Sequence, residues 1–310
     1  MFKCSYKIYL NTSLIVAVSL LFSVATINYM IDPYNRMGNN RIGLFHSLDR
    51  DIKNQIVFFN HDAILIGSSK TGRINPDELH FFTFYNASFD AATPEEIFFY
   101  LEKYAVHEKF VLIGLDFFMF NEREFPLKIM SEWHNKSYST IEYLLGGKVL
   151  RDSKKAVSLW LKNEKPYSIM KNGQKVFPKS FTPPDPQRIE PLIDILKKHH
   201  YGNVRFSDKR MEFIEKIKKL LEDRNIGYLF FINPLHEKIH ESLKGMPSYK
   251  LFIDWKKRLK LILPDLVDLS NSQYSDKDRF MANDCFHYRP ETGVDFLNKI
   301  MSDARSSRSI

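Results

Sequence analysis

Cysteine is scarce in this chain of 310 residues, since only Cys4 and Cys285 occur. Neither has a second cysteine in CxxC spacing, so cysteine metal chemistry is not indicated. Cys4 precedes a long apolar segment and Cys285 lies near the other end, so a membrane would separate them and we expect no disulfide between them. Internal repeats are absent, and no zinc finger, basic zipper or RNA-binding signature is present. We therefore expect no nucleic-acid partner.

A concentrated block of charge is also absent. The 45 Lys and Arg residues exceed the 37 Asp and Glu residues and give a net charge of +8, but the excess is spread along the chain. Such a balance suits an anionic membrane surface or an acidic polymer, and it also occurs without any specific partner. The 26 Phe and 15 Tyr residues are enough to build a sizeable core. The composition is that of a globular protein.

The N-terminus has the clearest regional signal. Lys3 and Lys7 precede an uncharged apolar run from about Leu14 to Ile31, which approaches the roughly 20 residues needed to span a bilayer. Lysines before such a run favour a cytoplasmic N-terminus. Ser23-Val24-Ala25 fits the cleavage site of a signal peptide, but the apolar run continues past it, which favours an uncleaved anchor. We predict a single-pass membrane protein whose main domain is periplasmic or extracellular.

Short apolar runs alternate with amphipathic segments over the rest of the chain. We expect strands at 63–66, 81–85, 110–116, 227–234 and 261–269, and helices at about 94–107, 140–161, 210–224 and 290–300. Buried strands that alternate with helices predict an α/β fold, a doubly wound parallel sheet with an N-terminal transmembrane helix. The predicted organisation is a cytoplasmic stub and anchor (1–32), a connector (33–59), an α/β domain (60–302, with an insertion at about 117–205) and a tail (303–310).

Ser69 is the first candidate for catalysis. The apolar run Ala63–Ile66 stops at Gly67 and is followed by Ser68 and Ser69. Functional groups in parallel sheets gather just past the carboxyl ends of the strands. A hydroxyl at this point can be a nucleophile, and it can also simply cap the following helix.

Asp284 and His287 form the second candidate group. Their spacing of three residues lets the carboxylate bind one imidazole nitrogen and leaves the other nitrogen for a hydroxyl. They follow the last predicted strand, so we expect them at the same edge of the sheet as Ser69. A nucleophile, a base and a group that orients the base would then meet in one cleft.

Four short motifs in this order resemble the SGNH/GDSL hydrolase-like superfamily, in particular its anchored, exported members linked to polysaccharide O-acetylation. The motifs are Gly67-Ser68-Ser69, Asn86–Ala92, Gly114-Leu115-Asp116 and Asp284-Cys285-Phe286-His287. The resemblance covers about residues 60–300 without the insertion, and it implies a flavodoxin-like three-layer fold. Neither a cofactor nor a metal is implied.

The resemblance implies an acyl-serine mechanism. Ser69 would attack an ester carbonyl, His287 would take and return the proton, and Asp284 would orient the ring. The oxyanion would meet the Ser69 amide and a donor in the Asn86–Ala92 loop, where Ala91 and Ala92 stand near the usual glycine. Asp116 occupies the place of an expected asparagine. An ionised Asp116 cannot donate, so it is either structural or replaced in this role by a donor such as Asn86.

The activity expected from the resemblance is hydrolysis or transfer of O-acyl esters, with acetyl groups on an envelope carbohydrate as the favoured substrate. A membrane acyltransferase is an expected partner. Lys70 and Arg73, which follow Ser69, are candidates for holding an acidic substrate or a leaving group, and they can equally be residues of a solvated helix face.

Two other functions remain open at this point. His236-Glu237-Lys238-Ile239-His240 is a literal H-E-x-x-H motif, which on a helix can bind zinc with the glutamate as general base. Its polar flanks and the missing third histidine favour an exposed helical turn instead of a zinc peptidase. The remaining alternative is a catalytically silent anchored subunit that binds glycan or a transferase partner.

Overall fold

The computed structural model describes residues 2–42, 49–127, 139–164, 168–177 and 186–307. The chain divides into two compact units. Unit 1 comprises Met1–Gln55 and Lys136–Ser168, and unit 2 comprises Ile56–Asn135 and Ile169–Ile310. The insertion predicted for 117–205 is thus divided, because its middle part belongs with the N-terminal segment. Parts of the predicted connector (43–48), insertion (128–138, 165–167, 178–185) and tail (308–310) lie outside the described residues.

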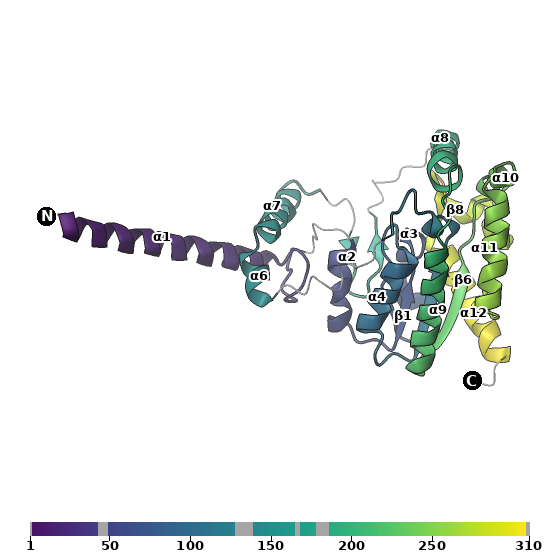
Figure 1. Cartoon of the computed structure of the whole chain (residues 1–310), viewed down its shortest axis with the longest axis horizontal. Helices are drawn as coiled ribbons and strands as arrows, with labels where there is room; N and C mark the ends of the chain where they lie inside the picture. Colours follow the sequence, from purple (N-terminus) through teal and green to yellow (C-terminus); the bar gives the residue numbers. More distant parts are fainter. Residues whose placement is uncertain (1, 43–48, 128–138, 165–167, 178–185, 308–310) are drawn as a thin grey trace. The chain divides into compact units, whose positions relative to one another are not determined.

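Unit 1 is built on the long N-terminal helix α1 (Phe2–Ile31), drawn in purple in Figure 1. Its segment Tyr6–Ile31 is long and apolar enough to cross a membrane. At 1.5 Å per residue these 26 residues extend for about 39 Å, which exceeds the roughly 30 Å of a hydrocarbon core. Most side chains of the segment are exposed, as a lipid-facing helix requires.

The C-terminal end of α1 is fixed by polar contacts within unit 1. Asn28 donates to the Leu144 carbonyl at 2.8 Å and accepts from the Ser153 hydroxyl at 3.1 Å. Asp32 accepts from the Tyr143 hydroxyl at 2.7 Å and from the backbone amides of Arg36, Met37 and Asn39. The helix predicted for 140–161 is two helices, α6 (Thr140–Leu145) and α7 (Gly147–Leu161), because the backbone is extended at Gly146.

Unit 2 contains a five-stranded parallel sheet in the order β2-β1-β3-β6-β7. The strands are β1 (Ala63–Ile66), β2 (Phe84–Asn86), β3 (Phe110–Leu115), β6 (Gly227–Ile232) and β7 (Val267–Asp268). Ala63 pairs with Phe84 on one side and with Phe110 on the other. The predicted α/β class and the parallel sheet are confirmed.

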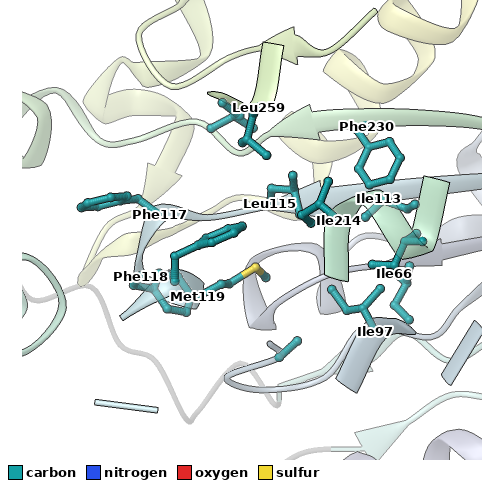
Figure 2. Close-up of a cluster of buried hydrophobic side chains, with 14 of the residues drawn as sticks. Ile66, Ile97, Ile113, Leu115, Phe117, Phe118, Met119, Ile214, Phe230 and Leu259 are labelled. Atoms are coloured by element: carbon teal, nitrogen blue, oxygen red, sulfur yellow. The ribbon is translucent and has the colours of Figure 1, made fainter. Parts of the chain in front are cut away.

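Alternate residues of the strands point into two separate apolar clusters, one on each face of the sheet. Ile64 and Ile66 of β1 enter the first cluster, and Ala63 and Leu65 enter the second. Helices α4 (Pro94–Tyr104), α9 (Asp208–Asp223) and α11 (Tyr249–Ile262) cover the first face, and α12 (Pro290–Ser307) covers the second. Figure 2 shows Ile97, Ile214 and Leu259 of the covering helices around the strand residues.

The fifth predicted strand is wrong in its first part. Residues 261 and 262 end helix α11, and only Val267–Asp268 pair with β6. The apolar run is helical because Leu259 and Leu263, four residues apart, are buried on one face, whereas Leu261 is 82% exposed. A short apolar run alone does not distinguish a helix end from a strand.

The site lies at the carboxyl edge of the sheet. From β1 the chain passes first to β2 on one side and then to β3 on the other side. A crevice forms at such a reversal of strand order, outside the carboxyl ends of the two strands. A second chain segment at this edge is the antiparallel pair β8 (Phe280–Met281) and β9 (Asp284–Tyr288). Asp284 and His287 therefore stand on strand β9.

Candidate active site

Ser69 is held in place by a tight turn after β1. It begins the four-residue helix α3 (Ser69–Gly72), and Ser68 caps this helix by accepting from the Lys70 amide at 3.2 Å. A side chain at Gly67 is not tolerated, because its Cβ would lie 2.8 Å from the Gly114 carbonyl oxygen of the neighbouring strand β3. The close approach of β1 and β3 thus leaves Ser69 half-buried at the carboxyl edge.

Ser69, His287 and Asp284 form a continuous hydrogen-bonded row. Ser69 Oγ lies 2.9 Å from His287 Nε2, and His287 Nδ1 lies 2.6 Å from Asp284 Oδ2. When the ring proton is on Nδ1, this N–H donates a hydrogen bond to Asp284, and Nε2 is left to accept the Ser69 proton. The structure brings together the three residues that the sequence predicted as nucleophile, base and orienting group.

Asp284 is held in its ionised form. Burial acts to raise its pKa, but the charge and hydrogen bond of His287, the charge of Arg73 and the Phe286 amide together lower the pKa to about 2. Arg73 Nη2 lies 3.4 Å from Asp284 Oδ2, and the amides of Phe286 and His287 donate to Oδ1 at 3.0 and 3.2 Å. These contacts fix both the charge and the orientation of the carboxylate.

His287 is held as a neutral base. Burial lowers its pKa below the ordinary value of 6.5, and it outweighs the opposing effect of Asp284, while the charges of Arg73 and Lys70 act in the same direction as burial. A neutral imidazole with a free nitrogen at neutral pH is the form that accepts a proton. Burial also raises the pKa of the adjacent Cys285 thiol to about 12, so this cysteine is not an activated nucleophile.

A second polar group, which consists of Lys70, Asp116, Ser68, Asn233 and Tyr288, lies in the interior beside the row. Asp116 Oδ1 lies 2.9 Å from Lys70 Nζ, and Asp116 Oδ2 accepts from Ser68 at 2.7 Å and from Asn233 at 3.0 Å. Asn233 in turn accepts from the Tyr288 hydroxyl at 3.0 Å. This interior network joins the ends of β1, β3, β6 and β9.

The interior network changes the interpretation of two predicted residues. The Lys70 side chain is 1% exposed and the Asp116 side chain is 2% exposed. Lys70 was a candidate either for holding substrate or for a solvated helix face, but its ammonium group is buried beside Asp116 and lies 4.8 Å from the centre of the Phe286 ring. The Asp116 side chain accepts hydrogen bonds and donates none, so it has a structural position and is not placed as an oxyanion donor.

Asn86 also has a structural position. Its side-chain amide donates to the carbonyls of Thr71 and Ile74 at 2.9 Å each, and its side-chain oxygen accepts from the Ser88 amide at 3.1 Å. Both carbonyls belong to the segment that begins with Ser69, so Asn86 holds α3 and the residues after it against β2. The oxyanion role expected for Asn86 is not supported by these contacts.

Of the four residues considered for the oxyanion site, which are Ser69, Asn86, Ala91 and Asp116, only Ser69 and Ala91 remain candidates. As the first residue of α3, Ser69 has no residue within the helix that could accept from its backbone amide. Ala91 adopts a left-handed backbone with φ of 51°, a conformation in which glycine is less strained.

The H-E-x-x-H segment has no metal-binding geometry in the described residues. His236 is the N-cap of α10 (Glu237–Lys244) and accepts from the Lys238 amide at 3.2 Å, so its ring is not on the helix face that carries His240. No group of three His, Cys, Asp or Glu side chains among the described residues is placed to hold a metal ion. The expected helical turn is present and exposes Glu237 and Lys238, but its two histidines are buried, since His236 is 4% exposed and His240 is 7% exposed.

Sequence reasoning missed several residues of the site. Asn233 directly follows β6, so the rule that led to Ser69 also applies to it. Helix α8 (Ile189–Leu196) packs against β9 beside the site. No sequence pattern predicts this, because the packing depends on contacts between distant segments. Comparison of the sequence with protein-family models and with curated proteins gives no match.

Proposed function

We propose that this chain is a membrane-anchored serine esterase or O-acyltransferase of the SGNH type. The observation that carries the proposal is the row Ser69–His287–Asp284, with distances of 2.9 and 2.6 Å between the successive partners. The strand order supports it as well: numbered within the sheet, β2-β1-β3-β6-β7 is the order 2-1-3-4-5 of flavodoxin-like folds.

The reaction follows from the row. His287 Nε2 takes the proton of Ser69 as Oγ bonds to the ester carbonyl carbon, and the Ser69 amide donates to the developing oxyanion. The carbon–oxygen bond to the alcohol then breaks, and His287 returns the proton to the leaving oxygen. Water or a second alcohol attacks the acyl-serine by the same route in reverse. Asp284 stays ionised and stabilises the imidazolium that forms in each step.

The setting of this chemistry is part of the proposal. Helix α1 would anchor the chain with its N-terminus in the cytoplasm, and unit 2 would lie in the periplasm or outside the cell. The alcohol would be a hydroxyl of an envelope carbohydrate, and a membrane acyltransferase would be the partner that supplies acyl groups. These assignments rest on the superfamily resemblance and on the apolar segment Tyr6–Ile31.

Ester turnover by the full-length chain in detergent tests the proposal. We expect hydrolysis of p-nitrophenyl esters to fall by about 10³-fold or more in Ser69→Ala and in His287→Gln. Ser158→Ala changes an exposed serine of α7 and should have the natural rate. Turnover that is unchanged in Ser69→Ala would contradict the proposal, and loss of turnover with a chelator would favour the zinc alternative instead.

A further inference from the structure

A large cleft opens beside the catalytic row. Its volume is about 880 Å³, which is within the range of about 300–1,000 Å³ for sites that hold drug-sized ligands. Asp284 and His287 line it from β9, and Arg73 lines it from the end of α3. An acetyl group has only two carbon atoms and would leave nearly all of this space unfilled.

One wall of the cleft is apolar. It consists of Pro191, Leu192, Ile195 and Leu196 of α8 together with Phe286 of β9. Ile195 is 55% exposed although it is a large apolar residue. An apolar side chain in such a position gains stabilisation when a ligand removes it from water.

The chemistry of this wall selects a hydrocarbon ligand. Each hydroxyl of a sugar needs a hydrogen-bond partner when it is desolvated, and the side chains of this wall carry no N–H, O–H or carbonyl group to provide one. An alkyl chain needs only contact. Polar side chains also line the cleft, among them Arg73, Gln187 and Arg188. In an acyl ester of a carbohydrate, the hydrocarbon part is the acyl chain.

We propose that the cleft between α8 and β9 is an acyl-chain site, and that the preferred acyl group is a linear alkyl chain of medium length instead of acetyl. This inference rests on the proposed function, because it places the ester carbonyl at Ser69. The chain would extend from Ser69 past His287 and along Leu192 and Ile195. It revises the acetyl specificity expected from the superfamily resemblance.

The first test is a series of p-nitrophenyl esters from acetate to decanoate with the full-length chain. A steroid-based detergent is used because it has no linear alkyl chain to compete. Burial of each methylene should raise kcat/KM roughly fourfold until the wall is covered. If the natural chain had the same kcat/KM for the acetate and the octanoate esters, the acyl-chain site would be overturned, but the proposed serine esterase activity would stand.

A matched pair of variants tests the position of the site. Ile195→Ser removes part of the wall and should lower the ratio of octanoate to acetate kcat/KM by roughly tenfold. Leu261→Ser removes a more exposed apolar side chain of α11, outside the cleft, and should leave this ratio unchanged. Equal ratios in both variants would place the acyl chain elsewhere. Selectivity for the alkyl length of the alcohol, and not of the acid, would also overturn the inference.

A second test does not need an active serine. A decanoic acid that carries a photoreactive diazirine is irradiated with full-length Ser69→Ala, and the labelled peptides are identified by mass spectrometry. We expect labels on α8 and β9 that decrease when Ile195→Ser is added. Labelling there combined with no ester turnover by the natural chain would retain the acyl-chain site and reject the proposed function. Labelling spread over all exposed apolar surfaces would reject the site.

Discussion

Lys70 Nζ lies 2.9 Å from Asp116 Oδ1, and both side chains are almost completely buried directly beside the nucleophile helix. This pair resolves the main difficulty of the sequence, which was a carboxylate at a position where an asparagine is expected. A buried carboxylate without a cation would repel a developing oxyanion. Here the charge of Asp116 is matched by an ammonium group one residue after Ser69.

The first prediction concerns the stability of this pair. Asp116→Asn leaves Lys70 as an uncompensated buried cation, and Lys70→Met leaves Asp116 as an uncompensated buried anion. Each single substitution should lower the free energy of unfolding by about 3–5 kcal/mol. In the double variant the loss should be smaller than the sum of the two single losses, because no lone charge remains buried.

Denaturant unfolding of the full-length chain, followed by circular dichroism, measures these losses. A control pair is Lys299 and Asp303 on α12, which lie 3.2 Å apart and are more than half exposed. Removal of that pair should change stability by less than about 1 kcal/mol. Strictly additive losses at Lys70 and Asp116 would show that the two charges do not interact.

The second prediction separates a structural from a catalytic role for Asn86. Asn86→Ala removes two hydrogen bonds to the carbonyls of Thr71 and Ile74 and leaves both carbonyls without these donors. We expect a loss of about 2–4 kcal/mol in the free energy of unfolding. Turnover per folded molecule should remain within about tenfold of the natural value. A fall of 10²-fold or more with unchanged stability would instead identify Asn86 as an oxyanion donor.

The third prediction is a pH profile. His287 acts as a base only when it is neutral, so kcat/KM should fall as acid protonates it. Burial lowers the pKa of His287 below 6.5, so the acid limb of the profile should have its midpoint below pH 6.5. Asp284, with a pKa of about 2, stays ionised throughout this range and adds no limb. A midpoint above pH 7 would contradict the buried, neutral base.

Arg73 provides a control for the sign of this effect. Its positive charge disfavours the protonated form of His287, so Arg73→Met should raise the pKa of His287 and move the acid limb to higher pH. Arg73→Lys keeps the charge and should move the limb less. A shift to lower pH in Arg73→Met would mean that Arg73 acts on the ring by another route, such as its contact with Asp284.

Much of the site could be predicted because it depends on local patterns. A buried apolar run that stops at Gly67 locates the end of a parallel strand, and the sheet geometry then fixes the edge at which Ser69 lies. The Asp284–His287 spacing likewise determines that the carboxylate can reach the ring. These two predictions meet at one edge because the separate antiparallel pair β8–β9 packs against α3, the helix that begins with Ser69.

Other features depend on contacts between distant segments. Burial of Lys70 is decided by Asp116 and Phe286, and no pattern around Lys70 shows that these residues will enclose it. The middle of the insertion belongs with α1 because Asn28 and Asp32 bind Leu144 and Tyr143. Such tertiary contacts override local propensity.

The most direct measurement is labelling of the full-length chain with a fluorophosphonate probe, read as intact mass. An activated serine predicts one adduct per chain, which also forms in Ser158→Ala and in the presence of a chelator. No adduct should form in Ser69→Ala or on chain that is unfolded before the probe is added. The absence of any adduct on natural chain whose fold is confirmed by circular dichroism would contradict the account. So would an adduct that persists in Ser69→Ala.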